Sequence, residues 1–171
     1  MDELKYPTGH YKRPQEYSQT ELEAWCQAIS SLPERLGFMV ENLDEDQLNK
    51  TYRDGGWTVS QLVHHLADSH MNGYMRYKLA LTENNPTIRP YDEKAFAELT
   101  DGKGPRIDSS LTLLEGLHLR WFRSIKSLND EDLVKELIHP EGNYPTKVFQ
   151  VIALYAWHGD HHLGHIKLAL K

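Results

Sequence analysis

The chain has one cysteine, no long apolar run and no excess of basic residues, and each lack excludes a class of protein. Cys26 is the single cysteine among 171 residues, so neither an internal disulfide nor a zinc site built from cysteines is available. The apolar stretches are too short to cross a bilayer, and residues 1–13 lack the apolar segment of a secretion signal. The sequence therefore predicts a cytoplasmic protein with no membrane partner.

Positive charge is too sparse and too scattered for a nucleic-acid-binding surface. Lysine and arginine total 19 against 25 aspartates and glutamates, which gives a formal net charge of −6. A phosphate backbone is bound by clustered cations, so we expect no nucleic-acid partner. The length and the 39% hydrophobic content fit one globular domain over residues 1–171. Pro7, Gly9 and Pro14 predict that residues 1–17 form an extended arm.

Four segments repeat apolar residues at the three-to-four-residue spacing of an amphipathic helix. The predicted helices run from Ser18 to about Leu43, from Val59 to Leu81, from Asp108 to Leu128 and from Val148 to the C-terminus. Residue types predict helix N-caps at Thr58, at Asp108 or Ser109, and at Thr146. Pro33 predicts a kink in the first helix.

The segments between these helices complete the predicted topology. A long, proline-containing connection precedes the third helix, with one short helix predicted over Glu93 to Leu99. Residues 139–143, with the sequence His-Pro-Glu-Gly-Asn, have turn chemistry that could join two short strands. We predict an all-α four-helix bundle with one long crossover and a short β-hairpin before the last helix.

Histidine is concentrated in the last helix, which holds four of the ten in the chain. On a helical wheel with Tyr155 at zero, His162 lies about 20° and His158 about 60° away, so both face the predicted core. His165 is marginal, at about 80°, and His161, at about 120°, is predicted to face water. Two histidines four residues apart can share one metal ion. The alternative, ordinary polar histidines at a helix end, remains open.

The second helix offers three further histidines. Periodicity favours His70, which lies within the apolar stripe, whereas His65 lies at the edge of that stripe. His65 nevertheless begins a polar row with Ser69, Asn72 and Arg76 that can either line a pocket or face solvent. His64 points away from the stripe and is predicted to lie on the surface.

Two motifs carry a resemblance to a known family. Residues 57–68, WTVSQLVHHLAD, and residues 158–166, HGDHHLGHI, resemble the DinB/YfiT superfamily of metal-binding four-helix proteins. The resemblance extends over most of the chain. It implies one metal ligand at the histidine that precedes Leu-Ala on the second helix, here His65. It implies two more at the HxxxH motif of the last helix, here His158 and His162.

Three ligands of this kind imply a catalytic metal, because they leave coordination positions open to water. The resemblance favours a metal-dependent hydrolase that acts on a small-molecule substrate with one divalent ion, Zn²⁺ or alternatively Ni²⁺. A second interpretation is an S-transferase that adds a cytosolic thiol similar to bacillithiol to electrophiles, and a third is a non-enzymatic metal or ligand binder. Asp68 and Asp160 could orient ligand imidazoles or could simply be solvated. The resemblance also implies a homodimer.

Overall fold

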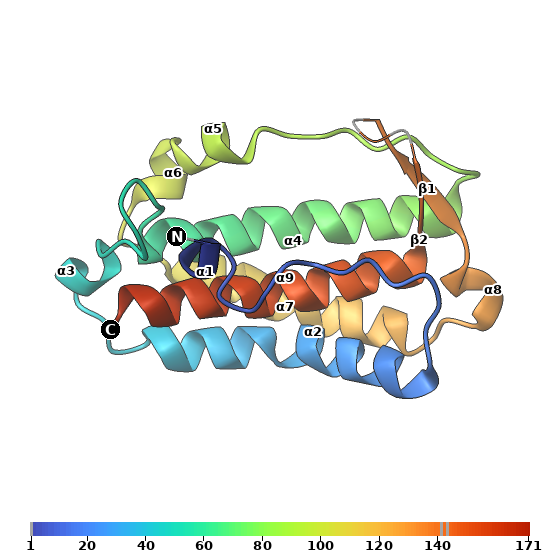
Figure 1. Cartoon of the computed structure of the whole chain (residues 1–171), viewed down its shortest axis with the longest axis horizontal. Helices are drawn as coiled ribbons and strands as arrows, with labels where there is room; N and C mark the ends of the chain where they lie inside the picture. The colour runs from blue at the N-terminus through green and yellow to red at the C-terminus, as the bar shows by residue number, and fades with distance from the viewer. Residues whose placement is uncertain (1, 141, 143) are drawn as a thin grey trace.

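Four long helices form the body of the molecule (Figure 1): α2 (Gln19–Val40), α4 (Val59–Thr82), α7 (Asp108–Ile125) and α9 (Val148–Ala169). The computed structural model describes residues 2–140, 142 and 144–171. Both α2 and α4 pack against α7 and against α9. In Figure 1, α2 and α9 run in one direction and α4 and α7 in the other. The predicted four-helix bundle is confirmed.

One of the predicted caps is confirmed: the Thr58 side chain caps α4 by accepting a hydrogen bond from the Gln61 backbone. Ser18, predicted as the first residue of its helix, is the N-cap of α2 and accepts from the Glu21 backbone in the same way. The cap predicted at Asp108 or Ser109 is wrong, because α7 already begins at Asp108 and Ile107 is its N-cap. The cap predicted at Thr146 is also wrong, because Thr146 belongs to a strand that continues to Lys147.

Helix α2 passes through Pro33 without ending, and a neighbouring helix satisfies the carbonyl that the proline leaves unpaired. Proline has no N–H, so Pro33 cannot donate to the carbonyl of Ile29 four residues earlier. His118 Nδ1 of α7 lies 2.6 Å from that oxygen. A carbonyl oxygen only accepts, so the His118 ring donates, and its hydrogen is therefore fixed on Nδ1.

The long crossover between α4 and α7 brings the chain back along the bundle (Figure 1) and ends beside the start of α4. It contains two short helices, α5 (Glu93–Ala97) and α6 (Thr100–Lys103), instead of the single helix predicted over Glu93 to Leu99. Leu99 has an extended backbone, with φ −69° and ψ 159°, and this separates the two. Gln61 Nε2 of α4 donates to the Ala97 carbonyl at 2.9 Å and anchors α5.

The predicted hairpin is present. Strands β1 (Glu136–His139) and β2 (Tyr144–Lys147) are antiparallel, with Glu136 opposite Lys147. Of the predicted turn, Glu141 and Asn143 lie outside the described residues.

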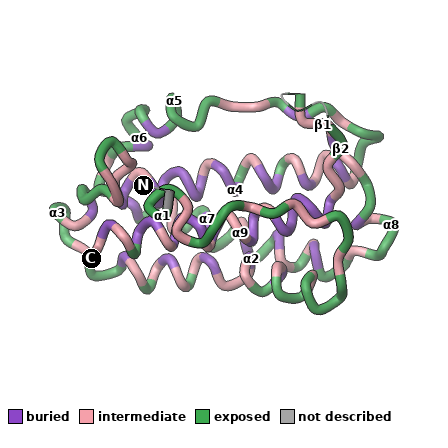
Figure 2. Tube along the Cα trace, viewed as in Figure 1, coloured by how far each residue is buried: buried purple, intermediate pink, exposed green. Residues whose placement is uncertain are grey.

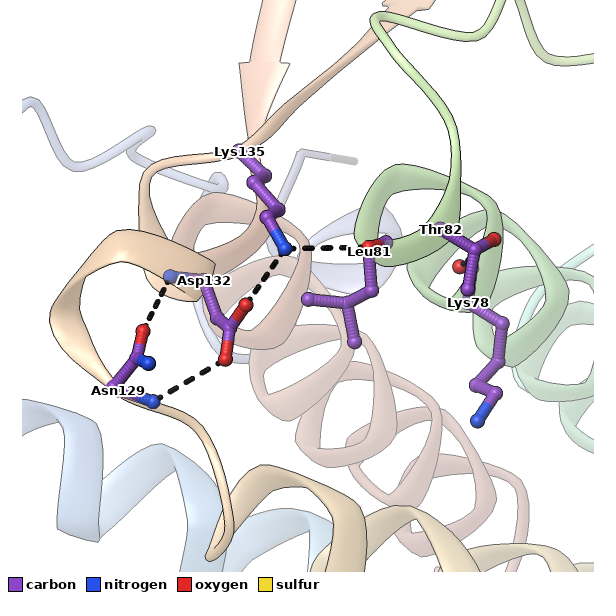
Figure 3. Close-up of polar contacts among 6 residues, drawn as sticks. All are labelled: Lys78, Leu81, Thr82, Asn129, Asp132 and Lys135. Atoms are coloured by element: carbon purple, nitrogen blue, oxygen red, sulfur yellow. Dashed lines mark hydrogen bonds and ion pairs between the residues drawn. The ribbon is translucent and has the colours of Figure 1, made fainter.

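The short helix α8 (Asp130–Leu133) joins α7 to the hairpin and is tied to the end of α4 (Figure 3). Asn129 caps α8 through the Asp132 backbone at 2.9 Å. Lys135 Nζ then contacts the Asp132 carboxylate at 2.8 Å and the Leu81 carbonyl of α4 at 3.3 Å. These bonds hold the start of the hairpin against the end of α4.

The first residues differ from the predicted extended arm, because they begin with one helical turn, α1 (Asp2–Lys5). The remainder of the arm lies along α9. Trp157 Nε1 donates to the Gly9 carbonyl at 3.2 Å, and Gln150 Nε2 donates to the Pro14 carbonyl at 2.7 Å. The other short helix, α3 (Glu45–Leu48), precedes α4. None of the described helices is long and apolar enough to span a membrane.

The interior contains two apolar clusters with a layer of histidines between them. One cluster includes Trp121 and Tyr155, and the other includes Leu66 and Leu163. The inward faces of the helices carry these clusters, as the buried segments in Figure 2 show. Along α4, α7 and α9, the stretches between the two clusters include His70, His118 and His158. A buried imidazole needs partners for both nitrogens, so this layer is where ligand chemistry is expected.

Candidate metal centre

The structure brings together the three histidines that the resemblance implies as ligands. His158 Nε2 of α9 lies 3.3 Å from His65 Nε2 of α4 and 3.2 Å from His162 Nε2, one turn further along α9. The ligand atoms of the three residues all lie within 4.8 Å of one another. Each ring therefore directs a nitrogen towards one common point between α4 and α9.

These spacings fit a single metal ion. Two imidazole nitrogens bound at about 2.0–2.1 Å to one tetrahedral ion lie about 3.3–3.4 Å apart. The two distances from His158 Nε2, 3.3 and 3.2 Å, are close to that separation. One ordinary hydrogen bond accounts for only one of these contacts, because His158 Nε2 carries either one hydrogen or one lone pair and faces two other ring nitrogens.

A cleft of about 700 Å³ opens over the three histidines. Its lining is mixed, with aromatic rings, both signs of charge and the backbone of a glycine pair. The aromatic side chains are Tyr6, Tyr52, Trp57 and Trp157; the charged ones are Lys5, Arg53, Glu93, Lys94 and Glu98. Trp57 packs directly on one of the three histidines, with its ring 4.6 Å from that of His65. The sequence predictions missed these lining residues, because all except Trp157 of α9 come from the N-terminal arm, the loop before α4 and the region of helix α5.

The prediction that His161 faces water is wrong, since its side chain is buried with 7% exposed. The wheel describes α9 alone, and the N-terminal arm covers this face. Tyr6 lies 5.9 Å from the His161 ring, and Trp157 stacks on that ring at 4.5 Å. His165, marginal on the wheel, is 2% exposed, and its Nε2 lies 3.1 Å from the Lys5 carbonyl.

The surface position predicted for His64 is also wrong. Only 5% of this residue is exposed, because the loop after α6 and the start of α7 cover it. Its two ring nitrogens lie 2.8 Å from Ser110 Oγ and 2.8 Å from the Gly104 carbonyl. Both ring nitrogens therefore have hydrogen-bond partners within the protein, and His64 does not belong to the cluster of three histidines.

His70, which periodicity favoured on α4, is fully buried and contacts the site at a different atom. Its Nε2 lies 3.1 Å from His158 Nδ1, whereas His65 and His162 face the other ring nitrogen of His158. Both candidates on α4 thus contact His158, each at a different ring nitrogen: His70, which periodicity favoured, at Nδ1, and His65, which the resemblance implied, at Nε2.

For several polar residues the sequence left open whether they belong to the site or face solvent, and their contacts in the structure now show where they lie. Asp160 forms an ion pair with Arg35 at 2.6 Å. Asp68 lines a separate cleft with His64 and Asp101. Asn72 donates to the Asp68 carbonyl at 2.9 Å, and Arg76 donates to the Arg89 carbonyl at 3.2 Å. None of these side chains belongs to the three-histidine cluster, and no described carboxylate oxygen lies within the 4.8 Å that groups its ligand atoms.

Burial keeps the histidines of the site neutral in the metal-free protein. Desolvation, with a smaller contribution from His161, lowers the pKa of His65 to about 4. Desolvation is also the largest cause of the lowered pKa values of His158 and His162. A neutral imidazole has a free lone pair, and that lone pair is what a metal ion requires.

Acidification is expected to destabilise the metal-free protein. The pKa of His65 and of His118 is about 4 when folded, against about 6.5 when unfolded, so the unfolded chain binds more protons between these values. The stabilisation from these neutral histidines is complete above about pH 6.5. At lower pH, the free energy of unfolding decreases by up to about 1.4 kcal/mol per pH unit for each such group. Urea denaturation at about pH 7, 6 and 5 measures the slope. A free energy of unfolding that stays constant over this range would contradict the expectation.

Sequence comparison gives the family. The sequence model described as the DinB superfamily matches residues 28–166, which contain all three clustered histidines. The chain belongs to the DinB superfamily. A DinB protein was therefore correctly expected from the two motifs on α4 and α9.

Relatives of this DinB chain share its full length. A Bacillus cereus protein named "Putative metal-dependent hydrolase" is 52% identical over 168 residues, covering 97% of this chain and 95% of its own. A Bacillus licheniformis protein whose name begins with the same words is 49% identical over 171 residues, covering 100% and 97%.

A solved structure extends the likeness to three dimensions. YfiT from Bacillus subtilis, described as "a probable metal-dependent hydrolase with an unusual four-helix bundle topology", is 45% identical to this chain. The two superpose with a TM-score of 0.94 over 96% of this chain and 94% of YfiT. The shared bundle includes the helices that carry the histidines.

Proposed function

We propose that this protein is a metal-dependent hydrolase that holds one divalent ion, Zn²⁺ or Ni²⁺, between His65, His158 and His162. The observation that carries the proposal is the convergence of three Nε2 atoms on one point at the base of an open cleft. The names of the full-length relatives support the same activity. Three protein ligands suit catalysis, because a structural zinc site uses four.

The residues of the site have separate roles in this proposal. A divalent ion bound by three imidazoles supplies a Lewis acid with positions open to water and substrate. His65, His158 and His162 provide neutral lone pairs, because burial lowers their pKa values. Trp57 packs on the His65 ring and limits its rotation. Arg53 and Lys94 line the cleft and give it cations that can attract the polar group of a substrate.

Thiol transfer is a second candidate because the histidine cluster contains no carboxylate. Among the described residues, no carboxylate oxygen lies within the 4.8 Å that groups the ligand atoms, so the cluster itself offers no carboxylate general base for a water nucleophile. A thiol is acidic enough for a metal ion alone to deprotonate it. The cleft volume of about 700 Å³ can hold a small thiol together with an electrophile.

Metal-loaded protein distinguishes the candidates when it is offered ester, amide and halogenated substrates with and without a low-molecular-weight thiol. Consumption without thiol supports the hydrolase, and consumption that requires the thiol supports the transferase. A bound metal with no turnover of either kind supports a metal-binding protein without enzymatic activity. If the wild type binds no divalent metal, all three are wrong. The homodimer stays a prediction, which sedimentation at micromolar concentration tests.

A further inference from the structure

Two of the three clustered histidines contact another histidine through the ring nitrogen that faces away from the cluster. His162 Nδ1 lies 3.2 Å from His165 Nδ1. His158 Nδ1 lies 3.1 Å from His70 Nε2. His70 and His165 are both buried, with 0% and 2% exposed. The proposed function assigns them no role.

The hydrogen positions on His165 and His162 follow from one backbone carbonyl. His165 Nε2 lies 3.1 Å from the Lys5 oxygen, which can only accept, so this nitrogen carries the hydrogen. Neutral His165 then has its lone pair on Nδ1 and accepts the hydrogen on His162 Nδ1. His162 is therefore left with its lone pair on Nε2, the atom 3.2 Å from His158 Nε2. The Lys5 carbonyl sets His162 in the tautomer that binds a metal.

His70 can act on His158 in the same way, although through its other nitrogen. A metal on His158 Nε2 requires the hydrogen on His158 Nδ1, and His70 Nε2 is the acceptor 3.1 Å away. The hydrogen of His70 is then on Nδ1, an atom buried without a hydrogen-bond partner among the described residues. The neighbouring His118 ring, 4.9 Å away, has an equally unpaired Nε2. His118 Nε2 carries a lone pair, because the single ring hydrogen of neutral His118 is on Nδ1, where it is donated to the Ile29 carbonyl.

We propose that His70 and His165 are positioning residues that hold His158 and His162 in the tautomer and ring orientation that direct both Nε2 atoms at one metal ion. This inference rests on the proposed metal site and adds two residues to it. Neither residue binds the metal. Partners of this kind typically change metal affinity about 10–100-fold when they are removed.

Amide substitutions test the proposal because the two acceptors sit on different ring atoms. Asparagine places its carbonyl oxygen near the position of Nδ1, and glutamine near that of Nε2. His165 accepts on Nδ1, so His165→Asn is expected to retain zinc affinity and His165→Gln to lose about 10–100-fold. His70 accepts on Nε2, so the order reverses: His70→Gln retains affinity and His70→Asn loses it.

The probe is Zn²⁺, titrated into metal-free full-length protein against a chromophoric chelator, and the visible spectrum of Co²⁺-loaded protein reports the ligand geometry. His64→Gln is the matched control, because His64 is also a buried histidine, lies on α4 and has Ser110 and Gly104 as its partners. Its zinc affinity is expected to equal that of the wild type even if the melting temperature falls. Circular dichroism confirms that each compared variant is folded.

The crossed order of the four variants distinguishes positioning from general packing. A purely structural role would make zinc affinity follow thermal stability, with no reversal between positions 70 and 165. Equal affinity for asparagine and glutamine at both positions would overturn the inference while leaving the metal site intact. Absence of zinc binding in the wild type would overturn the proposed function itself, so the two failures give different results.

Discussion

The His158→Ala variant is expected to lose metal binding and, with it, turnover. His158 Nε2 is the atom common to the two shortest contacts of the cluster, 3.3 Å to His65 and 3.2 Å to His162. Its removal leaves two ligands on different helices with no imidazole between them. Because loss of a mere supporting contact costs about 10–100-fold in affinity, loss of this ligand should cost more than about 100-fold. Elemental analysis after dialysis and a Zn²⁺ competition titration measure the change.

The matched control for this variant lies two residues along the same helix. Asp160→Asn removes a charge that pairs with Arg35 and does not touch the cluster, so one metal per chain is expected to remain. The exposed ion pair itself is worth at most about 1 kcal/mol of stability. A folded His158→Ala protein with the metal content and affinity of the wild type would show that the three histidines do not form the metal site.

The second large effect is expected in the core, where His118 and Pro33 should be energetically coupled. His118 Nδ1 donates at 2.6 Å to the Ile29 carbonyl, which has no backbone donor because residue 33 is proline. His118→Leu leaves this buried carbonyl unsatisfied and should lower the free energy of unfolding by about 1–3 kcal/mol. In a Pro33→Ala background, the new backbone N–H pairs with Ile29, and the same substitution should cost much less.

A double-mutant cycle by urea denaturation at about pH 7, where His118 is neutral, measures the coupling. The expected coupling energy is about 0.5–3 kcal/mol. Additivity of the two single substitutions would mean that the hydrogen bond contributes nothing to stability. Metal-free protein is the appropriate material, because bound metal would add its own stabilisation to every variant.

Much of the fold could be predicted because apolar spacing along each helix reports its buried face directly. The starts of α2 and α4 were predictable for the same local reason, since Ser18 and Thr58 cap them through contacts within three residues. The start of α9 was not, because Thr146 pairs with Leu137 in the hairpin and is committed to a strand. A cap signal is outweighed when tertiary pairing uses the same residue.

The candidate site was less predictable from the residues alone, because a helical wheel contains no information about what covers a helix. It placed His161 and His64 in water, whereas the N-terminal arm covers the first and the loop before α7 covers the second. It also preferred His70 to His65, since it measures the angle to the apolar stripe and cannot register which ring nitrogen meets His158. The family resemblance supplied His65.

The contact between Lys5 and His165 has a consequence for the order of folding. These residues are 160 positions apart in the sequence, so their contact closes a very long loop and carries a correspondingly large entropic cost. Helices α2, α4 and α7 are expected to associate before this contact forms, because their contacts are closer in the sequence. The tautomer of His162 in the proposed site is then fixed late in folding, after the bundle has assembled.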